Sequence, residues 1–269
     1  MIVMQNYPGE PSVAGQVAIV TGAGQGIGRG IALRLARDGY TVLLGDVRVP
    51  QTDAVAEEIR AAGGKAISTG MDVTRAADRE RAVETALREL GRLDVLVNNA
   101  AIQRASAPLE VTEEHWDAMM NVNAKSVWFM SQLAMQHFVA QTSGRIVNIA
   151  SIAGKMASTL YHPVYNVAKA GVIAMTKTFA HAGAPHGVRV NCVCPGVIDT
   201  AMQDQLDAEF SRLSNRPPEQ LRAERIARIP MGMMGRPEEV ADVVAFLASP
   251  AARYMTGQAI NISGGMLMY

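Results

Sequence analysis

The feature that most constrains the fold is a regular alternation of short apolar runs and longer helical patterns along the chain. Strands that are nearly continuous apolar runs are buried on both faces, as in parallel sheets covered by helices. We therefore predict an α/β fold with a doubly wound parallel sheet of seven strands. The predicted strands span residues 16–22, 41–46, 65–72, 93–100, 144–151, 188–196 and 257–265. The predicted helices span 28–38, 52–62, 76–91, 113–139, 164–183 and 237–248.

Length and charge limit the classes of partner. The chain has 269 residues, 49% of them apolar, with 25 basic and 25 acidic side chains. A net charge of zero provides no basic footprint for nucleic acid and no polybasic patch for membranes, which favours a small-molecule partner. Residues 1–14 form an extension too short and polar for a secretory leader, and no apolar run approaches ~18 residues. We expect a cytoplasmic protein with one catalytic domain over residues 15–269.

Two cysteines lie in the alternating run "VRVNCVCPG". Cys192 and Cys194 have no companion cluster of histidine or cysteine, so a zinc site is not predicted. Strand alternation places both thiols on one face of the sheet, where we expect them to pack in a core. We predict no metal.

A glycine-rich turn follows the first predicted strand. In "TGAGQGIGRG" the spacing G-x-x-x-G-x-G is met by Gly22, Gly26 and Gly28, whereas G-x-G-x-x-G is met in no register. Such a turn places backbone amides and a helix N-terminus beside a pyrophosphate. The sequence therefore predicts a dinucleotide site here.

A carboxylate ends the second predicted strand. Asp46 lies eighteen residues beyond Gly28, about where an acidic side chain binds the adenosine ribose hydroxyls. It would repel a ribose 2′-phosphate, and Val47 beside it supplies no cation. NAD is therefore favoured over NADP, although Arg48 weakens the argument.

A tyrosine and a lysine share one helix face in "YHPVYNVAKAG". Pro163 suits the first position of a helix, so Tyr165 and Lys169 lie one turn apart. Tyr161 precedes the helix and has no such partner. By itself the pair is also typical of a ring at the edge of a core beside a solvated lysine.

Taken together, these motifs resemble the short-chain dehydrogenase/reductase family over roughly residues 14–265. The resemblance rests on the glycine spacing, "NNAA" at 98–101, Ser151, "YNVAK" at 165–169 and "PG" at 195–196. It implies a one-domain Rossmann fold, a nicotinamide cofactor, and a homotetramer or dimer. The implied catalytic residues are Asn123, Ser151, Tyr165 and Lys169. The implied cofactor-binding residues are Gly22, Gln25, Gly26, Ile27, Gly28, Asp46, Val47, Asp72, Val73, Asn99, Ala100, Tyr165, Lys169, Pro195, Gly196, Ile198 and Thr200.

The family chemistry implies a role for each catalytic side chain. A free phenol has a pKa of about 10, and a nearby ammonium lowers such a pKa by ~1 to 3 units. We expect Lys169, together with the oxidised nicotinamide, to bring Tyr165 toward the range of a general base. Ser151 would bind the substrate oxygen, and Asn123 would anchor a water for proton relay.

The substrate class rests on features after the "PG" turn. A "T-x-M" sequence, a polar helix pair and "GGM" resemble the polyol, sugar and vicinal-diol dehydrogenases of the family. We predict an alcohol or ketone substrate contacted by Gln103, Ser151, His162 and Met202, with Tyr161 also near the pocket. His162 could instead cap the helix at Pro163. The alternatives are a reductase of 3-oxoacyl thioesters and a non-catalytic nicotinamide-binding regulator.

Overall fold

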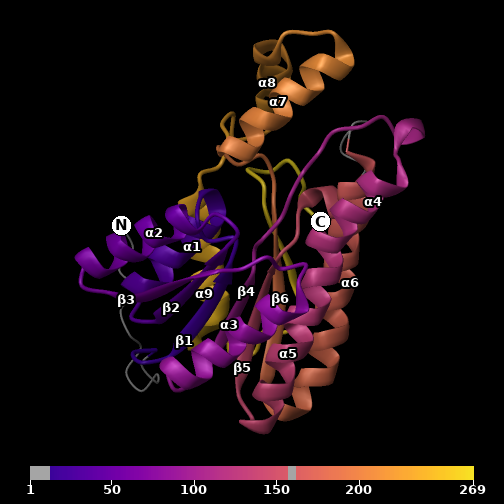
Figure 1. The fold of residues 1–269 in the computed structure, drawn as a ribbon. Coiled ribbons are helices and arrows are strands. Elements are labelled where there is room, and N and C mark those ends of the chain that lie inside the picture. The colour runs from indigo at the N-terminus through magenta and orange to yellow at the C-terminus, as the bar shows by residue number, and fades with distance from the viewer. Residues whose placement is uncertain (1–12, 157–161) are drawn as a thin grey trace.

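The computed structural model describes residues 13–156 and 162–269, with a sheet at its centre (Figure 1). All neighbouring strands pair in parallel, in the order β3-β2-β1-β4-β5-β6-β7. This confirms the predicted α/β class with a Rossmann-type, doubly wound sheet. Tyr161 and most of the predicted extension lie outside the described residues. The strands are β1 (Val17–Thr21), β2 (Thr41–Asp46), β3 (Lys65–Gly70), β4 (Val95–Asn98), β5 (Gly144–Ile149), β6 (Val188–Pro195) and β7 (Ala259–Ile262).

Helices cover both faces of the sheet (Figure 1). One core lies under α1 (Gly26–Arg37), α2 (Val49–Ala61) and α9 (Pro237–Ala248). The other lies under α3 (Ala76–Glu89), α5 (Ser126–Ala140) and α6 (Pro163–Gly183). Successive side chains of a strand point to opposite faces, so β1 contributes to both cores. Its Ala18 and Val20 belong to the first core and its Val17 and Ile19 to the second.

The predicted helix over 113–139 is divided in the structure. It consists of α4 (Glu113–Met120), a π-helical turn (Asn121–Lys125) and α5. Such single π turns inside helices are frequent at functional sites. The continuous helix expected from the sequence is therefore wrong at this turn.

Two further helices, α7 (Ala201–Ser214) and α8 (Pro218–Ala227), project beyond the sheet (Figure 1). The ranges predicted for helices omitted both, although the family resemblance indicated a polar helix pair in this region. The Glu209 carboxylate of α7 accepts a 2.7 Å hydrogen bond from the amide of Ala105, which ties α7 to the segment after β4. Short 3₁₀ helices span Pro108–Glu110, Ile152–Gly154, Ala184–His186 and Pro250–Ala252.

The two buried cysteines behave as predicted. Cys192 and Cys194 are both fully buried in β6, within a core cluster that also contains Val172 of α6. Neither thiol is available to a ligand at the surface.

Candidate active site

A cavity of about 630 Å³ lies where the sheet reverses its winding, at the carboxyl ends of β1 and β4. This is the position at which open α/β sheets bind dinucleotides. Three of the predicted cofactor residues, Pro195, Gly196 and Ile198, line an adjoining cavity instead. The predicted residues that line the larger cavity are Gly22, Gln25, Gly26, Ile27, Gly28, Asp46, Val47, Asp72, Val73, Asn99, Ala100, Tyr165, Lys169 and Thr200.

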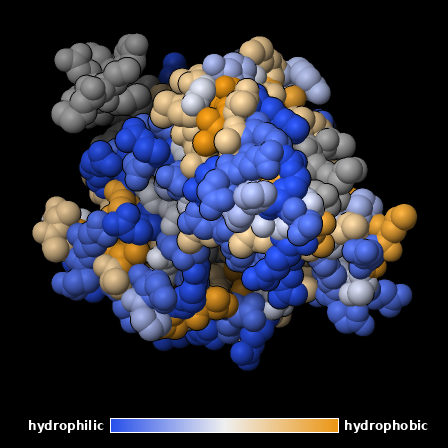
Figure 2. All heavy atoms as spheres, turned by 90° about the horizontal axis from the view of Figure 1, so that it is seen from above, coloured by the Kyte–Doolittle hydropathy of each residue, from blue (hydrophilic) through white to orange (hydrophobic). Residues whose placement is uncertain are grey.

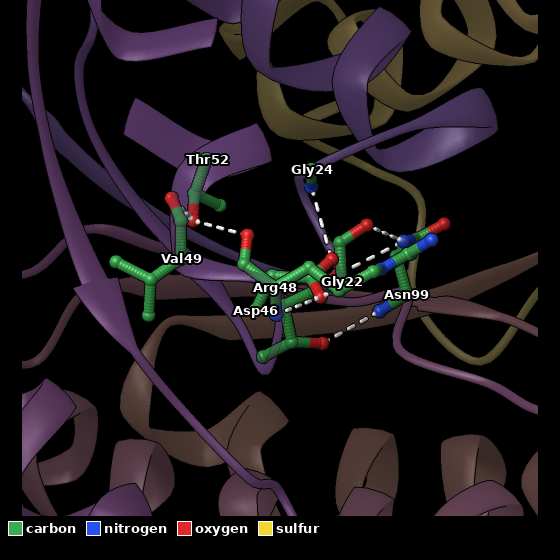
Figure 3. A network of polar contacts seen from close by, with 8 residues as sticks. Gly22, Gly24, Asp46, Arg48, Val49, Thr52 and Asn99 are labelled. Carbon is green, nitrogen blue, oxygen red and sulfur yellow. Dashed lines mark hydrogen bonds and ion pairs between the residues drawn. The ribbon is translucent and has the colours of Figure 1, made fainter. Parts of the chain in front are cut away.

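Close contacts between β1, α1 and the end of β4 leave room only for glycine at two positions of this turn. Gly22 has φ +65°, and a Cβ on it would lie 2.8 Å from the Cα of Ala100. A Cβ on Gly28 would lie 2.1 Å from the Gly22 carbonyl oxygen. The Asn99 amide donates to the carbonyls of Gly22 and Thr21 at 3.0 and 2.9 Å (Figure 3). The turn therefore holds the N-terminus of α1 at the cavity, where amide groups favour an anion.

The Asp46 carboxylate lies beside this turn (Figure 3). It is 4% exposed and accepts hydrogen bonds from the amides of Gly24 and Arg48, each 3.0 Å long. The Arg48 guanidinium lies 3.4 Å from the same carboxylate and is 42% exposed. The arrangement fixes a carboxylate where a ribose would lie, and places a cation within reach of it.

The residues predicted for catalysis come from β5 and α6. Ser151 follows β5, and its Oγ accepts a 3.1 Å hydrogen bond from the amide of Ala153. The Tyr165 phenol is hydrogen-bonded to Ser151. The Nζ of Lys169 lies 5.5 Å from the centroid of the Tyr165 ring and donates to the Ile149 carbonyl at 2.7 Å. Ser151, Tyr165 and Lys169 therefore lie together, as the sequence predicted.

Burial changes the proton affinities of this pair. It raises the pKa of Tyr165 to about 12, although the hydrogen bond from Ser151 opposes the shift. It lowers the pKa of Lys169 to about 8. Desolvation dominates the pKa of the phenol in this structure, and the expected lowering by Lys169 together with the oxidised nicotinamide stays a prediction.

Asn123 lies in the π-helical turn and is fully buried. Its Nδ2 donates to the Ile102 carbonyl at 2.9 Å, and its Oδ1 accepts from the Ile102 amide at 3.0 Å. It lines neither of the two cavities described here. The Asn123 side chain thus stabilises the segment after β4 in this structure. Its predicted catalytic role stays a prediction.

A second cavity of about 140 Å³ adjoins the first, and all four predicted substrate residues, Gln103, Ser151, His162 and Met202, line it. Tyr165 lines both cavities. The phenol is therefore at the junction of a dinucleotide-sized space and a smaller one.

His162 occupies the N-cap position of α6, but its side chain makes no capping hydrogen bond. Its ring stacks on Phe210 of α7 at a centroid separation of 5.7 Å and lies 6.0 Å from the Tyr165 ring. Burial, assisted by the charge of Arg225, lowers the pKa of His162 to about 4. The histidine is therefore a neutral wall of the second cavity rather than a helix cap.

Sequence reasoning missed the part of this cavity that comes from α7 and α8. Gln203, Leu206 and Phe210 of α7, Arg225 of α8 and Arg228 after it line the space. The available signal was the spacing of Arg222, Arg225 and Arg228, three residues apart on a short polar helix.

The described residues contain no cluster of three or more histidine, cysteine or acidic side chains that could hold a metal ion. Among them, no helix is both long and apolar enough to cross a membrane. On the face viewed from above, hydrophilic side chains predominate and hydrophobic ones form small separate groups (Figure 2).

Comparison with known proteins identifies relatives that match nearly the whole chain. Residues 22–267 match the family model described as enoyl-(acyl carrier protein) reductase. The chain is 39% identical over 254 residues to a 3-oxoacyl-[acyl-carrier-protein] reductase of Thermotoga maritima, covering 94% of this chain and 98% of that protein. It is 37% identical over 257 residues to the 2-dehydro-3-deoxy-D-gluconate 5-dehydrogenase of Escherichia coli, covering 95% and 97% of the two chains.

Among solved structures, a short-chain type dehydrogenase/reductase from Mycobacterium marinum is similar throughout. It superposes with a TM-score of 0.87 at 34% identity, covering 96% of this chain and 98% of that one. The similarity therefore extends over nearly the whole length of both chains.

Proposed function

Because the chain belongs to the short-chain dehydrogenase/reductase family, we propose that it oxidises a secondary alcohol of a polyol, sugar or vicinal diol to the ketone, reversibly, with NAD as hydride acceptor. Membership makes it an NAD(P)-dependent oxidoreductase acting on a small molecule. The substrate class, the preference for NAD and the roles of individual residues are the proposal.

The residues around the larger cavity fit a dinucleotide. A side chain at Gly22 or Gly28 would collide with backbone, so this turn is suited to close approach of a pyrophosphate. Asp46 lies where it would accept hydrogen bonds from ribose hydroxyls. When bound, the nicotinamide ring supplies the position that accepts or donates a hydride.

In the proposed reaction the Tyr165 oxygen takes the hydroxyl proton of the alcohol, while hydride leaves the carbon that bears this hydroxyl for the nicotinamide. Ser151, already hydrogen-bonded to Tyr165, would donate to the substrate oxygen and stabilise its developing charge. Lys169 would stabilise the phenolate through its ammonium. Reduction of the ketone returns the proton from Tyr165 to the substrate oxygen.

The observation that carries this proposal is the place of Tyr165. Its phenol borders both cavities, bonds to Ser151 and has the Lys169 ammonium close to its ring. A base at this junction would lie between an alcohol in the small cavity and a cofactor in the large one. A non-catalytic regulator would have no use for this arrangement.

The test is the absorbance of NADH at 340 nm when the protein is mixed with NAD and a panel of polyols, sugars and diols at alkaline pH. We expect turnover that falls about 100- to 10,000-fold in Tyr165→Phe. Calorimetry should show that the variant still binds NAD. Tight NAD binding without oxidation of any alcohol would instead support the regulator, and near-normal turnover by Tyr165→Phe would reject the proposed base.

A 3-oxoacyl thioester reductase is the second candidate, because a relative with that name is 39% identical over nearly the whole chain. The Asp46 carboxylate favours NAD over NADP, which argues against this candidate. Rates with acetoacetyl thioester and NADPH, compared with those for polyols and NAD, separate the two candidates. A higher kcat/KM for the thioester pair would replace the proposed function by the second.

The predicted homotetramer or dimer remains a proposal. It is supported by large apolar side chains on the outer surfaces of α5 and α6, where Trp128, Phe129 and Val167 are 37%, 38% and 46% exposed. Sedimentation of the purified protein would measure the oligomeric state.

A further inference from the structure

The charged groups that line the smaller cavity all have the same sign. Its described lining residues include the guanidinium groups of Arg225 and Arg228 and no carboxylate. Most of the other described lining residues are apolar, and those with polar side chains are uncharged at neutral pH. A cavity with this charge attracts anions, and a carboxylate forms stronger, charge-assisted hydrogen bonds with the guanidinium groups than the hydroxyls of an uncharged ligand do.

Two contacts fix the position of the Arg225 side chain. Its Nη2 forms an ion pair with Asp207, whose side chain is 4% exposed, and its guanidinium carbon lies 5.4 Å from the centre of the Phe210 ring. Asp207 is buried and is not among the cavity-lining residues. An arginine has five N–H donors, so an ion pair through Nη2 leaves donors for a ligand. The guanidinium is therefore positioned before any ligand arrives.

The Asp207 carboxylate does not neutralise the positive charge around it. It also accepts from the Nε of Arg222 at 2.6 Å and from Gln203 at 3.2 Å. Two guanidinium groups thus share one buried carboxylate, while the other ion pair of Arg222 goes to Asp204, whose side chain is 64% exposed. Arg228 adds a further charge at the exposed end of α8 and forms no ion pair within the described residues. Asp204 and Asp207 together balance Arg222 and Arg225, so Arg228 gives the cluster its net positive charge.

A series of packed side chains extends from Arg225 to Tyr165. The Arg225 guanidinium packs on Phe210, Phe210 stacks on His162, and His162 lies against Tyr165. Gln103 and Ser151 also line the space and provide neutral groups for hydroxyls. A bound molecule could therefore place an alcohol at Tyr165 and an anionic end at Arg225.

We propose that the substrate is a hydroxylated carboxylic acid, and that Arg225, with Arg228 beside it, binds its carboxylate. This inference rests on the proposed function, because it deepens the identity of the alcohol oxidised at Tyr165. Charge-assisted hydrogen bonds to a carboxylate are the contacts for which arginine is best suited. The arginines thus select a sugar acid over the neutral polyol with the same carbon skeleton.

The test uses the full-length protein with NAD and matched pairs of ligands, each a polyhydroxy acid and the polyol of the same length and stereochemistry. We expect the wild type to prefer an acid, and Arg225→Met to raise the KM for that acid about 10- to 100-fold. The KM for the matched polyol should change less than about threefold, and Arg225→Lys should recover part of the loss. Arg212→Met, an exposed arginine of α7 outside the cavity, is the matched control.

Calorimetric binding of the same ligands to the NAD-loaded protein makes the result independent of turnover. Acid binding that depends on Arg225 without oxidation of any alcohol would support the carboxylate site and reject the proposed function. Polyol oxidation with no preference for acids would support the proposed function and overturn the carboxylate site. Failure of every acid to bind more tightly than its polyol, or equal losses for both ligands in Arg225→Met, would also overturn it.

Discussion

The Lys169 ammonium lies 5.5 Å from the centre of the Tyr165 ring, one turn along α6. Lys169 is buried, whereas Tyr165 is partly exposed and borders both cavities. Burial has opposite effects on the two groups. It raises the pKa of the phenol to about 12 and lowers that of the ammonium to about 8. Each group is thus biased toward its neutral form, whereas the proposed base is a phenolate paired with a cation.

This opposition predicts how the rate depends on pH. Below the pKa of Tyr165 in the NAD complex, kcat for alcohol oxidation should rise about tenfold per pH unit, since only the ionised phenol accepts the proton. In Lys169→Gln the profile should move to higher pH by ~1 to 3 units, because the nearby cation is lost. Stopped-flow rates of NADH formation between pH 6 and 10.5 measure both profiles. A Lys169→Gln profile that coincided with that of the wild type would show that the ammonium does not stabilise the phenolate.

The contacts of Asp46 predict cofactor choice. Asp46→Ala removes the carboxylate beside the ribose site and frees the Arg48 guanidinium, which lies 3.4 Å from it. We expect the kcat/KM for NAD to fall about tenfold and that for NADP to rise, since repulsion of a 2′-phosphate is lost. Steady-state kinetics with both cofactors measure the ratio.

Glu57→Ala is the control for the Asp46 variant, because it removes a negative charge from the exposed side of α2 and lines neither cavity. It should leave the ratio of the two cofactors unchanged. An Asp46→Ala enzyme that kept the wild-type ratio would show that another group sets the preference.

The strands of the sheet could be predicted from the sequence because buried strands are nearly continuous apolar runs. The predicted bounds of β2 at 41–46 coincide with the observed ones, and β6 ends one residue before its prediction. Glycines and polar residues at the strand ends similarly indicated the dinucleotide cavity. These signals are local, so a single sequence is enough to reveal them.

Other parts of the site depend on contacts between distant segments. The π-helical turn is accompanied by two hydrogen bonds between the Asn123 side chain and the Ile102 backbone, which no periodicity in 113–139 encodes. The positive wall of the small cavity depends on how α7 and α8 dock above the sheet, and these helices are largely polar. His162 likewise acquires its neutral form from burial against Phe210 and from the charge of Arg225.

The two hydrogen bonds of Asn123 with Ile102 predict that removal of the Asn123 side chain lowers the stability of the protein. Asn123→Ala should reduce the free energy of unfolding by about 1 to 3 kcal/mol, because it leaves the part-buried amide and carbonyl of Ile102 without their side-chain partner. Asn121→Ala, two residues away and only half-buried, should change it by less than about 0.5 kcal/mol. Urea unfolding curves give both values. Equal stability of the two variants, with activity lost in Asn123→Ala alone, would instead favour a direct catalytic role.

Burial of His162 predicts how stability responds to acid. Its pKa is about 4 in the folded protein and about 6.5 in an unfolded chain, so between these values the unfolded chain binds a proton that the folded protein does not. Stability should therefore fall as the pH decreases from 6.5 to 4, with His162 contributing up to about 3 kcal/mol of the loss. In His162→Gln the difference in unfolding free energy between pH 7 and pH 4 should shrink by that amount, as measured by urea unfolding at both pH values. His181→Gln, an exposed position of α6, should behave like the wild type. If His162→Gln lost as much stability as the wild type on acidification, protonation of His162 would not contribute to that loss, and its pKa in the folded protein would not be lowered.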